Sequence, residues 1–86
     1  SLDPKRPGQL NNLGNIQYLL QDREKAIAYW KRSIGVKHDQ IDAHTNLGKA
    51  LYEVGRLKES SSHLQEVLRL DPKNEKAQIL LKKMIE

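Results

Sequence analysis

The side chains that could carry chemistry in this chain are three histidines and a run of three serines. His38, His44 and His63 could bind a metal ion or move a proton, but no two have the three- or four-residue spacing that places two ligands on one helix face. Ser60-Ser61-Ser62 lacks the Gly-x-Ser-x-Gly surroundings of a nucleophile, and no phosphate-binding loop is present. We therefore expect no enzyme activity, no catalytic residue, no metal and no cofactor.

The composition argues against several other classes of protein. There is no cysteine, which excludes a disulfide framework and a thiolate zinc site. No apolar run approaches 18 residues, so we expect no membrane span. The formal net charge is +4, but most basic residues alternate with acidic ones, as solvated helix faces do. The nearest approach to a basic stripe is Lys31, Arg32 and Lys37, with Lys25 close by.

The elements that must position these residues follow from an internal repeat. Asn12-Leu13-Gly14 returns 34 positions later as Asn46-Leu47-Gly48, and Tyr18 returns as Tyr52. A fixed period of this length is typical of a solenoid of stacked helical units. Such a stack presents an extended surface, so the sequence favours binding over catalysis.

Helical periodicity predicts five helices and no strand. Apolar residues recur at i, i+3, i+4 and i+7 in each segment. Gly55 can adopt the left-handed conformation that ends a helix. Gln21 is at the matching place in the first unit, where the same conformation would cost it about 1 kcal/mol. The predicted helices cover residues 7–20, 23–36, 40–54, 57–70 and 75–86.

Polar residues before three of these helices predict their caps. Asp22, Asp39 and Asn74 are the side chains expected to accept a hydrogen bond from the first turn of the second, third and fifth helix. Short connections make neighbouring helices antiparallel.

Two glycines inside helices predict close packing. Glycine costs up to about 1 kcal/mol there, which is tolerated where a partner helix approaches closely. Gly14 should therefore face Trp30, and Gly48 should face Leu64 at the same place in the second unit. His44 falls on the same apolar stripe and is expected to be a partly buried structural residue.

These residues resemble the tetratricopeptide repeat (TPR), a 34-residue helix–turn–helix unit. Its pattern is a large residue, Leu-Gly, an aromatic residue, a turn glycine, a small residue, a bulky residue and a closing proline. The first unit departs from the pattern at Gln17, Gln21 and His38, and the last segment departs at Lys82. The second unit reads His44, Leu47-Gly48, Leu51, Gly55, Ser60, Leu64, Val67 and Pro72.

The resemblance implies an all-α fold, a right-handed α-solenoid of antiparallel helix pairs. Residues 1–6 would be the tail of a preceding repeat, 7–40 and 41–74 two repeats, and 75–86 a capping helix. Together they make one domain, which we expect to be a piece of a longer protein.

The resemblance also implies a non-catalytic scaffold that binds a peptide or protein segment in its concave groove. Asn12 and Asn46 would clamp the ligand backbone, and Tyr18 and Tyr52 would offer flat contact area. Projected on this chain, the groove residues are Asn11, Asn12, Asn15, Tyr18, Leu19, Asp42, Thr45, Asn46, Lys49, Tyr52, Glu53, Lys76, Ile79, Leu80 and Lys83.

Some members of the family hold a C-terminal carboxylate with a clamp of Lys, Asn, Asn, Lys and Arg. Asn15, Asn46 and Lys76 match this set, whereas Asn11 stands in place of the first lysine and Leu80 in place of the arginine. Because both substitutions remove a charged donor, we expect the groove not to hold an acidic C-terminal tail tightly.

Two alternatives remain open. Two and a half units leave apolar ends exposed, so the chain could be a self-associating module and form a homo-oligomer. The basic residues could make it a weak RNA-binding repeat, although a continuous stripe with interleaved aromatics is missing. No small-molecule substrate is expected. The sequence names neither partner nor compartment, and the cytoplasm is the default expectation.

Overall fold

The computed structural model describes residues 6–85 and shows five helices, with no strand in that range. The helix boundaries agree with the predicted ones to within one residue. The expectations for residues 1–5 and for residue 86 lie outside the described part of the chain. The helices are α1 (Pro7–Leu19), α2 (Arg23–Val36), α3 (Ile41–Glu53), α4 (Leu57–Leu70) and α5 (Glu75–Ile85).

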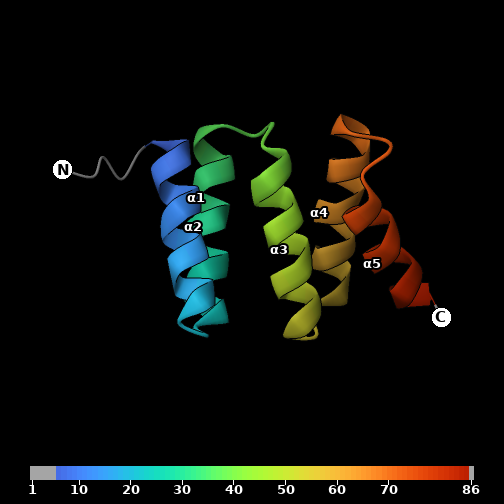
Figure 1. Ribbon diagram of the computed structural model, residues 1–86, viewed down its shortest axis with the longest axis horizontal. Helices are drawn as coiled ribbons and strands as arrows, with labels where there is room; N and C mark the ends of the chain where they lie inside the picture. The colour runs from blue at the N-terminus through green and yellow to red at the C-terminus, as the bar shows by residue number, and fades with distance from the viewer. Residues whose placement is uncertain (1–5, 86) are drawn as a thin grey trace.

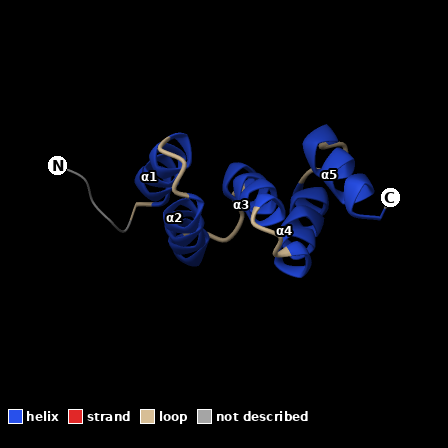
Figure 2. Ribbon diagram, turned by 90° about the horizontal axis from the view of Figure 1, so that it is seen from below, coloured by secondary structure: helices blue, strands red, loops and turns tan. Residues whose placement is uncertain are grey.

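The helices form two layers in a thin, elongated array. In Figure 2, α1, α3 and α5 lie in one layer, and α2 and α4 lie in the other. The helices follow one another along the long axis, with α1 and α5 at opposite ends (Figure 1). The extents are 44 × 26 × 17 Å, and the most extensive contacts join α1 to α2 and α3 to α4. This is the all-α solenoid of helix pairs that the sequence predicts.

The two turns inside the helix pairs have the same geometry. Gln21 has a φ of 64° and Gly55 a φ of 84°, so both adopt the left-handed conformation. In each turn the next residue's N–H reaches back five positions: Asp22 N donates to Gln17 O and Arg56 N to Leu51 O, both at 2.9 Å. These bonds satisfy main-chain carbonyls at the helix end. The second unit makes the turn with glycine, whereas the first makes it with Gln21, whose side chain is strained at a positive φ.

Two of the three predicted caps are confirmed and one is wrong. Asp22 accepts a hydrogen bond from Lys25 N at 3.1 Å, and Asn74 accepts one from Ala77 N at 3.0 Å. Asp39 does not cap α3, because α3 begins at Ile41 and Gln40 is its N-cap residue. The Asp39 carboxylate instead accepts a hydrogen bond from the Arg69 guanidinium at 3.3 Å.

The glycines allow close approach at both predicted places. A Cβ atom built on Gly14 would lie 2.4 Å from Trp30 Nε1, and one on Gly48 would lie 2.4 Å from Leu64 Cδ2. Trp30 is 2% exposed and Leu64 is fully buried. Ser60 Oγ also donates to Gly48 O at 2.5 Å, which joins α4 directly to the backbone of α3.

No helix in residues 6–85 is long and apolar enough to cross a membrane.

Candidate functional site

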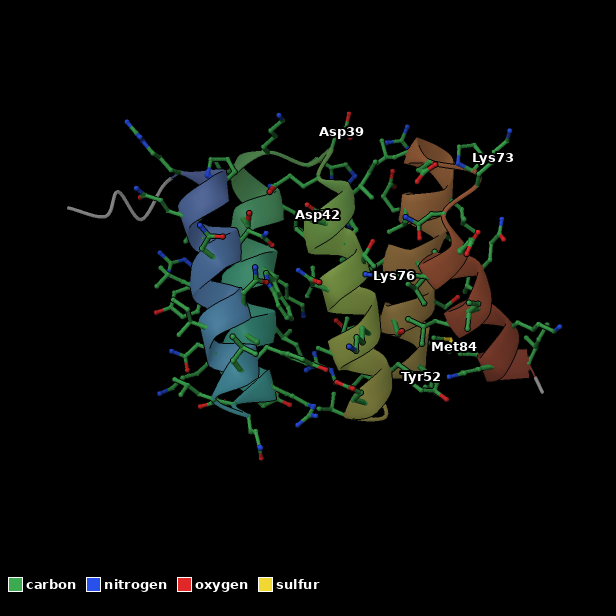
Figure 3. All side chains as sticks on the ribbon, viewed as in Figure 1. Asp39, Asp42, Tyr52, Lys73, Lys76 and Met84 are labelled. Carbon is green, nitrogen blue, oxygen red and sulfur yellow. The ribbon has the colours of Figure 1, made fainter. Side chains whose placement is uncertain are left out.

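A groove runs along the layer formed by α1, α3 and α5. It consists of two adjoining hollows of about 680 and 300 Å³, which share Thr45, Asn46, Lys49 and Lys76. We call their combined lining the concave groove. Figure 3 shows Lys76 over the space between α3 and α5, with Asp42 above it on α3.

The structure brings most of the predicted groove residues together. Asn12, Tyr52, Glu53 and Lys83 line neither hollow. The predicted residues that do line them are Asn11, Asn15, Tyr18, Leu19, Asp42, Thr45, Asn46, Lys49, Lys76, Ile79 and Leu80.

Four lining residues were not among those predicted: Trp30, Ile41, Asn74 and Glu75. Asn74 and Glu75 stand at the start of α5, and Ile41 at the start of α3. Their position at the first turn of a groove helix was the signal that could have identified them. Trp30 was predicted only as a packing residue between helices.

Two asparagines of the groove lining join α1 to α3. Asn46 Nδ2 donates to Asn15 Oδ1 at 3.1 Å, and Trp30 Nε1 donates to the same oxygen at 3.2 Å. Asn15 Oδ1 therefore accepts twice, which fixes the orientation of its amide. Within residues 6–85, Asn15 Nδ2 has no protein partner, so the pair offers N–H donors to the groove.

Asn11 has a different role from Asn15. Its main-chain carbonyl accepts a hydrogen bond from Trp30 Nε1 at 3.1 Å. Its side-chain Oδ1 is buried and has no hydrogen-bond partner among the described residues. An unsatisfied buried acceptor is destabilising by about 1–3 kcal/mol, so Asn11 is a weak point of the groove floor.

A polar cluster of Tyr18, Arg23 and Glu53 lies beside the groove, and Tyr18 is its member in the groove lining. Tyr18 OH donates to the Glu53 carboxylate at 2.8 Å, and Arg23 Nε donates to the same carboxylate at 3.0 Å. Partial burial acts to raise the pKa of Glu53, but the hydrogen bonds from Tyr18 and Arg23 outweigh it and hold that pKa below its ordinary value. The Glu53 carboxylate thus accepts its hydrogen bonds from side chains of the same chain.

The charges on the groove lining balance. Lys49 and Lys76 are the basic residues of the larger hollow, and Asp42 and Glu75 are its acidic ones. Lys49 Nζ also lies 5.4 Å from the centre of the Tyr18 ring, a cation–π distance. The groove therefore lacks a strong field of either sign.

The five positions of the carboxylate clamp lie close together in the fold. Asn11, Asn15, Asn46 and Lys76 line the larger hollow, and Leu80 lines the adjoining one. The positions expected for a clamp therefore share this groove, and the first and last of them, Asn11 and Leu80, carry no charge.

The three histidines gather where the α2–α3 loop meets α3 and α4. The rings of His38 and His44 have centres 4.9 Å apart, and those of His44 and His63 are 5.2 Å apart. As predicted, His44 is buried. Their gathering was missed, because helical spacing predicts contacts only within one helix. In the described range, no three His, Cys, Asp or Glu side chains are arranged to hold a metal ion.

The basic residues outside the groove are partly neutralised. Lys31 Nζ lies 2.9 Å from a Glu59 carboxylate oxygen, and Lys25 Nζ lies 3.9 Å from Asp22. These contacts weaken the field that a nucleic-acid backbone would need.

Comparisons with known proteins agree with this architecture. A family model described as "TPR repeat" matches residues 14–55, and one described as "Tetratricopeptide repeat" matches residues 41–74. No curated protein gives a significant match.

Two solved structures share the fold. The first TPR of Spaghetti (RPAP3), bound to the HSP90 peptide SRMEEVD, is 23% identical with a TM-score of 0.91, covering 96% of this chain and 66% of that chain. The second TPR domain of human RPAP3, in complex with the HSP70 peptide SGPTIEEVD, is 24% identical with a TM-score of 0.89, covering 98% of this chain and 70% of that chain.

Proposed function

Because the chain belongs to the tetratricopeptide repeat family, we propose that it is a non-catalytic module that binds an extended peptide segment in its concave groove. The observation that carries this proposal is the Asn15–Asn46 pair, which presents N–H donors in the wall of the larger hollow. An extended peptide has main-chain carbonyls along both edges, and these are the acceptors that such donors match.

The balance of charges favours a neutral or mixed segment. Lys49 and Lys76 attract acidic side chains, while Asp42 and Glu75 repel them in the same hollow. The solved relatives hold peptides that end in acidic residues. In this chain Leu80 and Asn11 provide no charge at the outer clamp positions, so we propose weak binding of such tails.

Selection from a random heptapeptide phage library tests the groove as the binding site. Enriched peptides should bind the parent chain and lose binding to Asn46→Ala, since loss of a buried amide contact costs roughly 1–3 kcal/mol, or about 5- to 150-fold in affinity. Asn12→Ala is the matched control, because Asn12 is exposed on α1 and outside the groove. Enriched peptides that bind Asn46→Ala and the parent equally would contradict the proposal.

A second titration tests the weak hold on acidic tails. The probe is the peptide SRMEEVD, beside the same peptide with an amidated C-terminus. We expect weak binding by the parent and at least tenfold tighter binding by Asn11→Lys/Leu80→Arg, which restores two charge-assisted donors. Low-micromolar binding by the parent that amidation abolishes would show that the clamp already operates.

A further inference from the structure

The histidine pair, His44 and His63, joins α3 to α4 through a single shared hydrogen. The two Nδ1 atoms are 3.0 Å apart. His44 Nε2 lies 2.8 Å from the carbonyl oxygen of His38, which can only accept, so this nitrogen carries a hydrogen. In the neutral ring the Nδ1 of His44 is then an acceptor, and the hydrogen between the rings belongs to His63.

This arrangement has room for one hydrogen between the rings and no more. A proton added to His44 must go to Nδ1, where it would face the N–H of His63 across 3.0 Å. A proton added to His63 must go to Nε2, and it would place a charge on a half-buried ring. Because the rings are in contact, a charge on either one also opposes a charge on the other.

The surroundings of the pair do not favour a positive charge. Lys31 on α2 and Glu59 on α4 are the charged side chains, other than the histidines, that act on His63. Glu59 already accepts hydrogen bonds from Lys31 at 2.9 Å and from Arg56 at 2.7 Å. Burial, then His44, then Lys31 lower the pKa of His63 to about 4, against a weaker opposite effect of Glu59.

The other charged groups lie on the loop side of the pair. Burial is the main reason that the pKa of His44 is lowered, and His38 O, Glu66 and Asp39 oppose it. Glu66 is hydrogen-bonded to Arg69, and His38 Nε2 lies 3.6 Å from it. Arg69 also holds Asp39. Both carboxylates near His44 therefore have cationic partners already.

We propose that the histidine pair is a pH-sensitive contact: it is closed when both rings are neutral, it is weakened when one of these buried rings carries a charge, and it opens when both do, as the solution becomes acidic. Opening would loosen the first turn of α3 from α4 and from the α2–α3 loop. The sign follows from the lowered pKa values: the unfolded chain takes up protons first, so stability is full above about pH 6.5 and declines toward pH 4.

The first unit shows that the fold does not need these histidines. Thirty-four positions earlier, Leu10 stands in the place of His44 and Tyr29 in the place of His63. Leu10 is buried as His44 is. The chain thus has residues that do not titrate in the acid range at the equivalent positions of its first unit, and His44→Leu/His63→Tyr is the matched variant.

The test compares thermal melting temperatures of the parent and the double variant from pH 7.5 to pH 4.5. The parent should lose several degrees more than the variant, because all other titrating groups are common to both. Parallel melting curves across the pH range would overturn the proposal.

A second measurement uses the parent protein alone, so it tests the proposal even if the double variant folds poorly. Amide hydrogen-exchange protection of the first turn of α3 should fall between pH 7 and pH 5 by a larger factor than that of the first turn of α1, after correction for intrinsic exchange rates. Equal losses in the two turns would also overturn the proposal.

Discussion

At the residue scale, the effect of an asparagine in the groove depends on whether its amide is hydrogen-bonded. Asn15 accepts two hydrogen bonds and orients its amide, whereas Asn11 buries an oxygen with no partner in the described range. The same side chain is therefore stabilising at one position and destabilising one helical turn earlier.

Replacing each of these asparagines with alanine should have opposite results. Asn15→Ala should lower the free energy of unfolding by about 1 kcal/mol, because Trp30 Nε1 and Asn46 Nδ2 both lose an acceptor. Asn11→Ala should leave that free energy unchanged or raise it by up to about 1 kcal/mol. Urea unfolding followed by circular dichroism measures both, and a larger loss for Asn11→Ala would contradict the assigned roles.

The close approach at Gly48 gives a second prediction. Gly48→Leu should lower the free energy of unfolding by about 1–3 kcal/mol, because even a Cβ atom would lie 2.4 Å from Leu64 Cδ2. Gly35→Leu is the control, because Gly35 also lies in a helix and a Cβ atom there has no neighbour within 4 Å. The free energy of unfolding of this variant should not fall. Thermal melts that match the parent for Gly48→Leu would refute the packing role.

Repetition predicted most of the residues that line the groove, but it did not predict the contact between two of its asparagines. A 34-residue period makes Asn46 equivalent to Asn12, which is exposed, whereas Asn46 is hydrogen-bonded to Asn15. Identical positions on parallel helices point the same way and do not meet, so a contact between helices joins positions offset by about one turn. The histidine pair was missed for a related reason, since His44 and His63 meet only through the packing of α3 on α4.

At the scale of elements, the two left-handed turns are the same device made with different residues. The 34-residue spacing from Gly55 back to Gln21 places the two residues at matching turns, and both adopt the left-handed conformation. The predicted helix boundaries are correct to within one residue. The cap of α3 was not predictable in the same way. Asp39 is a good capping residue by type, but Gln40 turns back to the carbonyl oxygens of Ser33 and Lys37 and sets the start of the helix.

Exchanging the two turn residues tests this equivalence. Gln21→Gly should raise the free energy of unfolding by about 1 kcal/mol, because glycine adopts a φ of 64° without a steric penalty. Gly55→Gln should lower it by a similar amount, since the φ of 84° then disfavours the side chain. Chemical denaturation of both variants measures the changes, and changes of the same sign would exclude a common turn geometry.

At the scale of the whole molecule, the apolar interior has two centres along the array. One contains Trp30 and joins α2 to α3, and the other joins α4 to α5 through Leu64, Val67 and Ala77. In a linear array each unit is stabilised mainly by its neighbours, so damage at one end need not unfold the other.

Ala77→Asp should make the two centres unfold at different urea concentrations. The new carboxylate would be buried at a fully buried position, which should unfold α5 and loosen α4. The loss of helicity should therefore begin at a lower urea concentration than the change in Trp30 fluorescence. Lys82→Asp, on an exposed position of the same helix, should keep the two transitions together. Coincident transitions in Ala77→Asp would show that the array unfolds as one unit.

The position of Trp30 gives the molecule a built-in optical signal. It is the only tryptophan in the chain, it lines the groove, and its indole N–H is shared between Asn11 O and Asn15 Oδ1. A ligand that draws on the Asn15 amide changes the polarity felt by the indole without touching the ring. Occupancy of the groove can therefore be followed by the emission wavelength of the unlabelled protein, and Asn15→Ala should uncouple that emission from binding.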